Sequence, residues 1–338
     1  MARKKIRVAV IGAGAVAQIN HIPAYSRLDT AEVVAACDID SEKAKRVAAR
    51  FGIPTATPDH DEIFARDDID AVDVCVPNHL HAPMTIGALN SGKHVLCEKP
   101  FSRSPQEAGR MVAAAEKNGR VLMAAFNNRF RNDAQLLKTF VDKKEVGRIF
   151  YAKTGWLIKH ASWDEKSWKA QKRFAGGGVL IDLGVQMLDL SLWILGMPEV
   201  ETVSASTARR PEIDDVESSA AAFIRLAGGA TLTLEVGWSL LMEKDFAYVN
   251  LFGEHGAALL NPFRLHKEMH GSLVNVTPAT ESIRNVYKLS YEAEIAHFID
   301  CVRSGRKPAA PGSEAVTVLK VLEAIYKSAE SGREVKLA

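Results

Sequence analysis

Lys99 is the side chain of this sequence that best suits proton-transfer chemistry. It comes after the apolar run 93–97 and stands between Glu98 and Pro100, and the proline restricts the backbone that follows. A partly desolvated lysine in this setting can donate a proton to a hydroxyl or carbonyl oxygen of a substrate. The simpler alternative is a solvated lysine beside a turn proline. The three residues alone leave both interpretations open.

A glycine-rich turn near the start of the chain suits the binding of a phosphate. The apolar run 6–11 is followed by Gly-Ala-Gly-Ala-Val-Ala at 12–17. Gly12 permits a tight turn, Gly14 lets backbone N–H groups approach a pyrophosphate, and Ala17 is small enough for a helix to pack on the strand. An α/β turn without a ligand is the alternative. The predicted dinucleotide contacts in this turn are Gly12, Ala13, Gly14, Ala15 and Val16.

Asp38 ends a second apolar run, 33–37, about twenty residues beyond the glycines. A carboxylate there can accept hydrogen bonds from a ribose 2′-hydroxyl and would repel a 2′-phosphate. The sequence therefore predicts NAD as the cofactor and makes NADP less favoured. Polar residues also follow the later apolar runs, where the ends of parallel strands would bring them to the same ligand. These further predicted cofactor contacts are Val76, Pro77, Asn78, His81, Glu98, Lys99 and Asn127.

Apolar runs alternate with amphipathic helices as far as about residue 126. Near-continuous apolar strands separated by helices indicate an α/β fold with a parallel sheet that is covered on both faces. Helix starts are marked as well, because Ser41 is a candidate N-cap and Ser104 with Glu107 forms a candidate capping box. The predicted strands are 6–11, 33–37, 71–76, 93–97 and 121–125.

Beyond about residue 145 the pattern changes to longer strand-like segments, and most of them have no helix between them. Such strands predict a largely antiparallel sheet, and Gly228-Gly229 predicts a hairpin. We divide the chain into a first domain, 1–126, and a second, 127–338, whose C-terminal helix can pack back on the first. The predicted strands are 149–157, 200–206, 218–226, 230–237 and 246–252, and the predicted helices are 180–195, 291–303 and 313–331.

The composition excludes several classes of function. The 338 residues have a formal net charge of +2, with 47% hydrophobic and 25% charged residues, as is ordinary for a soluble globular protein. We find no basic stripe typical of nucleic-acid binding and no apolar run long enough to span a bilayer. The four cysteines and the acidic and histidine side chains show no metal spacing. We therefore expect no metal, no nucleic acid, no membrane and a cytoplasmic location with reduced cysteines.

Taken together, these motifs resemble the Gfo/Idh/MocA oxidoreductase family. The resemblance runs from residue 6 to about 330 and includes the segment 176–184, Gly-Gly-Gly-Val-Leu-Ile-Asp-Leu-Gly. It implies a Rossmann domain followed by an α/β domain with an open antiparallel sheet. It also implies NAD(P)-dependent chemistry on a sugar or polyol, and a homodimer or homotetramer joined through the open sheet face. In family terms Lys99 is the catalytic lysine, and Glu98 and Asn78 lie by the cofactor.

Two positions depart from the family pattern. Relatives commonly carry Asp-x-Gly-x-His, whereas this chain has Asp182 and Gln186, four residues apart and so on one face of a helix. A glutamine cannot titrate as histidine does, but it can orient a hydroxyl. Trp168-Lys169 stands where many relatives have Trp-Arg near the nicotinamide. We therefore expect Trp168 and Lys169 to contact the cofactor.

Asp182 and Gln186 are predicted to bind substrate and to take part in catalysis with Lys99. A helix-capping role for Asp182 and a polar core role for Gln186 are the alternatives. His160 lies in a polar, aromatic segment and is a further candidate substrate contact, which could supply the missing proton acceptor. An exposed loop is the simpler interpretation of that segment.

The leading hypothesis is an NAD-dependent oxidoreductase that transfers a hydride between a sugar or cyclitol carbon and nicotinamide. A second hypothesis keeps NAD tightly bound for a transient oxidation that supports elimination or glycoside cleavage. NAD that survives dialysis, with product but no net reduced cofactor, would identify it. A third is a dinucleotide-sensing protein without catalysis, which stabilisation by NAD without turnover would identify.

Overall fold

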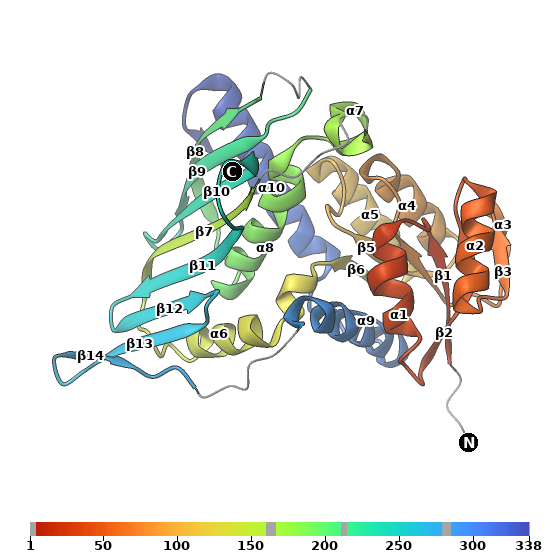
Figure 1. The fold of residues 1–338 in the computed structure, drawn as a ribbon, viewed down its shortest axis with the longest axis horizontal. Coiled ribbons are helices and arrows are strands. Elements are labelled where there is room, and N and C mark those ends of the chain that lie inside the picture. Colours follow the sequence, from red (N-terminus) through yellow and green to blue (C-terminus); the bar gives the residue numbers. More distant parts are fainter. Residues whose placement is uncertain (1–4, 160–166, 211–214, 279–284, 338) are drawn as a thin grey trace. The chain divides into compact units, whose positions relative to one another are not determined.

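The computed structural model describes residues 5–159, 167–210, 215–278 and 285–337. Its contacts divide the chain into two compact units (Figure 1). The first unit contains Met1–Phe130 together with Asn285–Val316, and the second contains Arg131–Arg284 together with Thr317–Ala338. This division differs from the predicted domains 1–126 and 127–338, because a late segment of the chain groups with the first unit.

The first unit is built on a six-stranded sheet in the order β3-β2-β1-β4-β5-β6. Every neighbouring pair is parallel, which confirms the predicted parallel sheet. The chain starts in the middle at β1, moves outward to β3 and then crosses to β4, so the strand order reverses between β1 and β4. The strands are β1 (Ile6–Ile11), β2 (Ala31–Cys37), β3 (Thr55–Thr57), β4 (Ala71–Val74), β5 (His94–Glu98) and β6 (Leu122–Ala125).

Helices connect these strands and begin at local capping signals. Ser104 accepts a hydrogen bond from the amide of Glu107, as predicted. The N-cap of α2, the helix that ends at Phe51, is Asp40 and not the predicted Ser41. A carboxylate one residue earlier thus replaces the predicted hydroxyl cap. The helical segments are η1 (Ala17–His21), α1 (Ile22–Tyr25), α2 (Ser41–Phe51), α3 (His60–Ala65), η2 (Asn78–Leu80), α4 (His81–Asn90), α5 (Pro105–Asn118), η3 (Asn127–Phe130) and α9 (Val286–Ser304).

Arg129 shows why a late segment belongs to the first unit. Its side chain is fully buried, and one guanidinium nitrogen lies 2.5 Å from a carboxylate oxygen of Glu314 and 2.9 Å from the carbonyl oxygen of Ala309. An isolated bridge also pairs Met123 with Pro311. A buried guanidinium needs such partners, and here the late segment supplies them. Helix α10 (Gly312–Ser331) begins in this unit and continues into the second.

The second unit is built on a nine-stranded sheet in the order β14-β13-β12-β11-β7-β10-β9-β8-β15. Only the β7–β10 pair is parallel among the described strands of this sheet, which confirms a largely antiparallel arrangement. The predicted turn at Gly228-Gly229 joins β9 to β10, and both glycines have positive φ. The strands are β7 (Ile149–Lys159), β8 (Val200–Ala208), β9 (Ser219–Leu226), β10 (Thr231–Leu240), β11 (Phe246–Gly253), β12 (Gly256–Leu260), β13 (Arg264–Met269), β14 (Ser272–Asn275) and β15 (Val335–Lys336).

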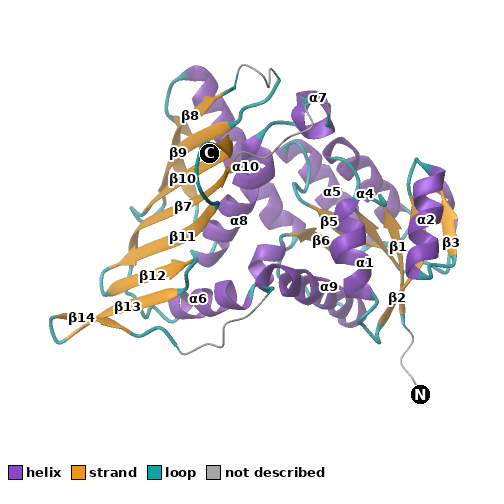
Figure 2. Ribbon diagram, viewed as in Figure 1, coloured by secondary structure: helices purple, strands orange, loops and turns teal. Residues whose placement is uncertain are grey.

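One face of this sheet is buried and the other is exposed. Along β9 the even-numbered residues from Ala220 to Leu226 are buried, while Phe223 on the other face is exposed. Helices α6 and α8 lie along the sheet (Figure 2). The helical segments of this unit are α6 (Asn132–Asp142), η4 (Trp168–Ala170), α7 (Lys172–Ala175), η5 (Leu180–Gly184) and α8 (Val185–Ile194).

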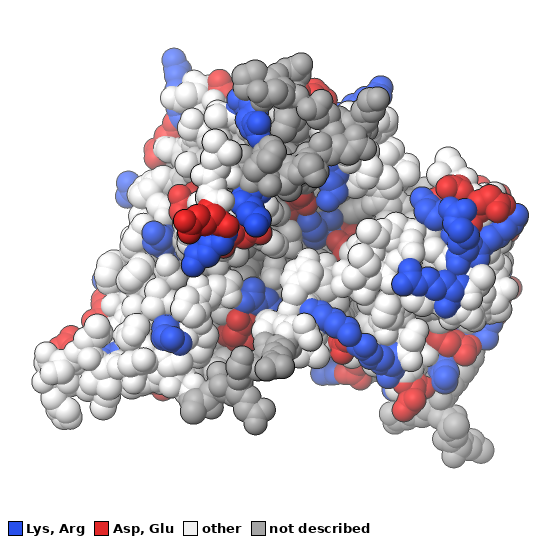
Figure 3. All heavy atoms as spheres, viewed as in Figure 1, with Lys and Arg blue, Asp and Glu red and all other residues white. Residues whose placement is uncertain are grey.

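The stretch Lys172–Ile194 corrects one expectation from the sequence. It is long and apolar enough to cross a membrane by length and composition, although we predicted that the chain contains no such run. In the structure 89% of its apolar window is buried inside the protein. Its apolarity is therefore that of a core helix. On the surface drawn in Figure 3, basic and acidic side chains are interspersed, in keeping with a net charge of +2.

Candidate active site

The carboxyl ends of the parallel strands bring the predicted cofactor contacts of the first unit to one edge of its sheet. Gly12 follows β1, Asp38 follows β2, Val76 lies just beyond β4, Lys99 follows β5 and Asn127 lies just beyond β6. Strands β1 and β4 are neighbours, and β5 is next to β4. In doubly wound sheets, ligands bind outside these strand ends at the point where the strand order reverses. The candidate site is therefore at this edge.

The two glycines of the turn serve different purposes. Gly12 has φ of +99°, and a Cβ atom there would lie 2.4 Å from the carbonyl oxygen of Cys75. Any other residue would collide with the backbone that follows β4. Gly14 has no heavy atom of the described chain within 4 Å of the corresponding Cβ position. Its lack of a side chain is therefore not required by packing, which suits the close approach of a ligand.

A dinucleotide fits this turn. Helical structure begins at residue 15, so Ala15 and Val16 lie in a first turn whose amides have no acceptor within the helix. Such amides are a ready site for a pyrophosphate. Ala13 and Ala17 are buried in an apolar cluster with Val10, which packs the start of the helix on the strand as predicted. These residues would hold the diphosphate of the cofactor.

Asp38 is tied to the glycine turn. One of its carboxylate oxygens accepts a hydrogen bond from the backbone amide of Ala13 at 2.9 Å. The other accepts one from the backbone amide of Asp40 at 3.0 Å. The ammonium group of Lys43 lies 2.9 Å from the second oxygen. This cation was not considered in the sequence interpretation, and it offsets part of the repulsion that Asp38 would exert on a 2′-phosphate. Asp38 alone therefore does not decide between NAD and NADP.

His81 connects two of the strand-end loops. Its ring nitrogens lie 2.7 Å from the carbonyl oxygen of Pro100 and 2.8 Å from that of Val76. Burial lowers the pKa of His81 more than these two carbonyls and Glu98 raise it. The ring therefore serves to hold the loop after β4 against the loop after β5. Its contact with a cofactor stays a prediction, as do those of Pro77 and the buried Asn78.

Lys99 is held through its backbone. It is partly exposed, and its amide donates a hydrogen bond to a carboxylate oxygen of Glu98 at 2.8 Å. The other oxygen of Glu98 lies 3.0 Å from a ring nitrogen of His21. Burial on its own would raise the pKa of Glu98, but the hydrogen bond and charge of His21, with Lys99, outweigh it and lower the pKa. Glu98 is therefore an ionised group that fixes the backbone of Lys99.

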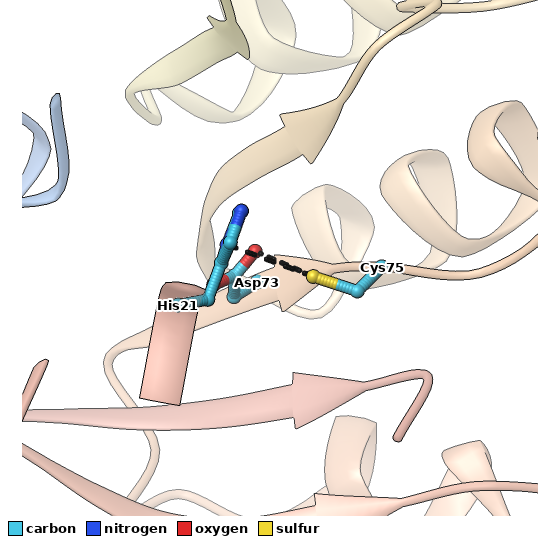
Figure 4. A group of neighbouring side chains, drawn as sticks. All are labelled: His21, Asp73 and Cys75. Carbon is cyan, nitrogen blue, oxygen red and sulfur yellow. Dashed lines mark hydrogen bonds and ion pairs between the residues drawn. The ribbon is translucent and has the colours of Figure 1, made fainter. Parts of the chain in front are cut away.

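His21 and its neighbours form a buried cluster that the sequence interpretation missed. His21 comes from the end of η1, Asp73 from within β4 and Cys75 from just beyond β4, and the three side chains point toward one another (Figure 4). Asp73 inside an otherwise apolar strand was the available signal, because a charge there requires a partner. His21 carried no signal of its own.

The cysteines fit the interpretation of buried, unreactive side chains. All four are free and buried. Burial raises the pKa of Cys37 to about 12, and it raises the pKa values of Cys75 and Cys97 as well. Thiols with raised pKa values are poor nucleophiles. The compartment in which the protein works stays a prediction.

Asn127 follows β6 and faces the late segment of the first unit. Its side-chain amide donates a hydrogen bond to the hydroxyl of Ser290 in α9 at 2.9 Å, and it is 2% exposed. This contact anchors α9 to the strand-end region. A cofactor contact of Asn127 stays a prediction.

In the second unit, Gly176-Gly177-Gly178 lies between α7 and η5, just before the long core helix. A Cβ atom on Gly178 would lie 2.0 Å from the carbonyl oxygen of Glu217, and one on Gly177 would lie 2.1 Å from the hydroxyl of Tyr326. Close packing against the backbone of Glu217 thus requires glycine at position 178. The buried carboxylate of Glu217 accepts hydrogen bonds from the amides of Gly178 and Leu180 and from the hydroxyl of Tyr326. Glu217 was not identified from the sequence.

The start of this helix positions Asp182, which matches the family pattern, and Gln186, which departs from it. Asp182 is partly buried within η5, and Gln186 is 4% exposed in the first turn of α8. The side-chain amide of Gln186 donates to the carbonyl oxygen of Asp182 at 3.0 Å. The two residues therefore lie on one face of the helix, as their spacing predicted. Their contacts with substrate stay predictions.

Trp168 and Lys169 lie in the short segment η4 and are partly buried. The hydroxyl of Ser167 accepts a hydrogen bond from the amide of Lys169 and so starts this turn. Their contact with a cofactor is not tested by these interactions. His160, the further candidate substrate contact, lies outside the described residues.

Comparison with known families identifies both parts of the chain. Residues 6–126 match the pattern described as "Oxidoreductase family, NAD-binding Rossmann fold". Residues 138–337 match "Oxidoreductase family, C-terminal alpha/beta domain". The two matches together cover nearly all of the described sequence. The sheet edge with the glycine turn thus belongs to an NAD(P)-binding Rossmann domain.

Similar proteins act on or bind sugars and polyols. The D-glucoside 3-dehydrogenase of Escherichia coli (strain K12) is 31% identical over 352 aligned positions, which cover 100% of this chain and 99% of the relative. The aldose-aldose oxidoreductase from Caulobacter crescentus, solved in complex with glycerol, has a TM-score of 0.87 at 27% identity, covering 99% and 100%. GenD2 from gentamicin A biosynthesis, solved in complex with NAD, has a TM-score of 0.85 at 26% identity, covering 100% and 98%.

Proposed function

We propose, from the premise that the chain belongs to the Gfo/Idh/MocA oxidoreductase family, that it is an NAD-dependent dehydrogenase of a sugar or cyclitol. The reaction moves a hydride between a CH–OH carbon and nicotinamide. Its relatives include sugar dehydrogenases such as the D-glucoside 3-dehydrogenase at 31% identity and a D-apiose dehydrogenase at 26% identity. These names support the class of substrate and leave open which sugar and which carbon react.

The observation that carries the proposal is the neighbourhood of β1, β4 and β5 in the parallel sheet. It brings the glycine turn, the loop from Val76 to Asn78 and Lys99 to the same edge. The ring of His81 lies between the carbonyl oxygens of Val76 and Pro100 and so connects two of these loops. A dinucleotide bound at the turn would extend along the edge on which Lys99 stands.

Lys99 is the proposed catalytic residue. When bound, the nicotinamide ring supplies or accepts the hydride. During oxidation the neutral amine of Lys99 would accept the proton of the reacting hydroxyl group, and during reduction the ammonium form would donate a proton to the carbonyl oxygen. The rigid backbone of Lys99, held by Glu98, suits this task because a misplaced proton donor loses most of its effect.

Asp38 supports NAD as the cofactor, because its carboxylate stands beside the glycine turn where an adenosine ribose would be bound. In the second unit, Asp182 and Gln186 would orient hydroxyl groups of the sugar. Gln186 can both donate and accept hydrogen bonds and cannot act as a base. The proton route of the proposed reaction therefore rests on Lys99.

The test is a panel of aldoses, glucosides and cyclitols with NAD and with NADP, followed by the absorbance of reduced nicotinamide. We expect NAD-dependent turnover of at least one compound, and loss of about 10² to 10⁴ of that turnover in Lys99→Ala with dinucleotide affinity retained. The matched control is Lys117→Ala, which removes an exposed lysine from α5 of the same unit and should keep full activity.

Other outcomes would replace the proposal. Undiminished turnover in Lys99→Ala would remove Lys99 from the chemistry. Product formation with dialysis-resistant NAD and no net reduced nicotinamide would favour redox-assisted elimination or glycoside cleavage. Dinucleotide binding without turnover of the whole panel would favour a sensing role.

A further inference from the structure

A cluster of ionisable side chains from η1, β4 and β5 is buried in the first unit, next to the backbone of Lys99. His21 and Asp73 are each 0% exposed, and Glu98 is 5% exposed. Side chains of this kind are rarely buried without a purpose, because taking a charge out of water is unfavourable unless a partner balances it. Strands of a parallel sheet are ordinarily near-continuous runs of apolar residues, so the charged Asp73 within β4 is unusual.

The geometry around His21 suits a ring that donates from both of its nitrogens. His21 Nδ1 lies 2.7 Å from an oxygen of Asp73, and its Nε2 lies 3.0 Å from an oxygen of Glu98. An ionised carboxylate can only accept hydrogen bonds, so a ring between two of them donates from both nitrogens and is an imidazolium. Burial alone would lower the pKa of His21, but Asp73, with Cys75, outweighs burial and raises it well above its ordinary value.

The imidazolium is connected to Lys99 through one carboxylate. The second oxygen of Glu98 accepts a hydrogen bond from the amide of Lys99 at 2.8 Å. The interactions therefore form a continuous series from Asp73 through His21 and Glu98 to the backbone of Lys99. We propose that His21 is a positioning residue for Lys99, which keeps Glu98 ionised and oriented so that Glu98 holds the lysine backbone in place.

The surroundings of His21 keep water out and hold the charges apart from solvent. From α9, the ring of Tyr291 packs on the His21 ring with centroids 5.5 Å apart, and Tyr287 contacts Tyr291. Other titratable groups interact with the members of this cluster. They are Tyr25 from α1, Cys75 beyond β4, His81 from α4, Cys97 from β5, Lys99 and the buried Glu294 from α9. The described neighbours include no second cation inside the sheet.

A metal ion is the competing interpretation of the same side chains. His21, Asp73 and Cys75 offer ligand atoms that lie within 4.8 Å of one another. The 2.7 Å separation of nitrogen and oxygen is nevertheless shorter than the about 3.3 Å expected between two ligands of a tetrahedral zinc ion. It is the length of a charge-assisted hydrogen bond. Glu98 on the far side of the ring gives the imidazolium its second acceptor.

The proposal rests on the proposed role of Lys99, so its experiment includes a readout that does not depend on turnover. In His21→Gln we expect exchange of the Lys99 amide, followed by deuterium uptake of the peptide around it, to accelerate about 10-fold or more. We expect kcat with the best substrate to fall about 10- to 100-fold, because the lysine is less well placed. The dissociation constant of NADH should change by less than about 3-fold, since the glycine turn is untouched.

The pH profile separates positioning from a general loss of structure. Without His21, Glu98 is a buried carboxylate that lacks its cation, and its pKa should rise. A new loss of kcat/KM on the acidic side should therefore appear in His21→Gln and be absent from the wild type. The double variant His21→Gln/Glu98→Gln should not show this acidic loss of kcat/KM. It should also regain part of kcat, because a neutral side-chain amide oxygen can still accept a hydrogen bond from the backbone amide of Lys99.

The matched control is His94→Gln, which changes a histidine at the opposite end of β5. It should reduce thermal stability without altering Lys99 exchange, NADH affinity or the pH profile. Should His21→Gln fail to fold, Asp73→Asn removes the charge that holds the ring protonated and should give the same effects in weaker form.

Two results would overturn the proposal. Unchanged exchange of the Lys99 amide in folded His21→Gln or Asp73→Asn would show that the series does not position the lysine. Stoichiometric zinc in the purified protein, with a chelator that reproduces the His21→Gln phenotype, would make the cluster a metal site. Full turnover in Lys99→Ala would instead defeat the proposed function, while the exchange result would still report on the structural coupling.

Discussion

Glu98 in the first unit and Glu217 in the second perform the same task in different ways. Each is a buried carboxylate that accepts hydrogen bonds from backbone amides and so fixes a segment with a candidate functional residue. Glu98 holds Lys99, and its charge is balanced by the ring of His21. Glu217 holds Gly178 and Leu180 at the start of the helix that carries Asp182 and Gln186.

The difference lies in what stabilises the negative charge. Glu217 is surrounded by neutral donors, namely two helix-start amides and the hydroxyl of Tyr326, and a helix N-terminus favours an anion. Glu98 depends on a cation that can itself lose its proton. A buried carboxylate that holds backbone amides is therefore coupled to a titrating histidine in the first unit and to uncharged donors in the second.

Removing the carboxylate of Glu217 should have the largest effect on stability. Glu217→Ala leaves the donors of Gly178, Leu180 and Tyr326 buried without their acceptor, and we expect a loss of about 3 to 5 kcal/mol. Glu217→Gln keeps one acceptor oxygen and should lose about 1 to 2 kcal/mol. All five tryptophans lie between residues 131 and 284, so urea unfolding followed by tryptophan fluorescence reports on this unit. Equal losses in both variants would contradict the role of the acceptor.

Two glycines, Gly178 in the second unit and Gly14 in the turn after β1, should separate packing from ligand binding. Gly178→Ala places a Cβ atom against the backbone of Glu217 and should cost about 2 to 4 kcal/mol of stability. Gly14→Ala meets open space and should change stability by less than about 0.5 kcal/mol. It should instead weaken NADH binding about 10-fold or more, as measured by nicotinamide fluorescence, because the methyl group meets the pyrophosphate. Normal NADH affinity in Gly14→Ala would refute the proposed phosphate site.

The pH dependence of stability should show the smallest effect. The raised pKa of His21 contributes stability that is complete below its ordinary value of 6.5 and is lost as the pH rises toward the pKa of the folded state. The lowered pKa of Glu98 contributes above its ordinary value of 4.5 and is lost as the pH falls through the folded-state value. The stability difference between wild type and His21→Gln should therefore be greatest between pH 4.5 and 6.5.

Above pH 6.5 that difference should decline by at most about 1.4 kcal/mol per pH unit. Over the same range the hydroxyl of Tyr326 keeps its proton and stays a donor to Glu217, since burial and Glu217 raise the pKa of Tyr326 well above its ordinary value of 10. Deuterium uptake of peptides from 6–126 and tryptophan fluorescence measure the two units separately. A stability difference between wild type and His21→Gln that does not change with pH would show that His21 is not protonated in the folded protein.

Local sequence signals predicted much of what positions the site. The strand 6–11, the glycine turn, the capping residue Ser104 and the hairpin at Gly228-Gly229 each depend on neighbours within a few residues. For the same reason short or irregular strands were missed, among them β3, β12, β13, β14 and β15. Their few residues carry too little alternation to distinguish a strand from a loop.

The sequence by itself determined that Lys99, Asp38 and Gly12 stand at strand ends, because apolar runs and glycines encode strands and turns locally. Only the tertiary structure decided that His21 lies between Asp73 and Glu98, that Lys43 stands beside Asp38 and that Glu217 caps the glycine run. These pairings join residues that the fold, and not the spacing along the chain, brings together. Buried charges obtain their partners through packing, and a linear pattern does not record which partner that is.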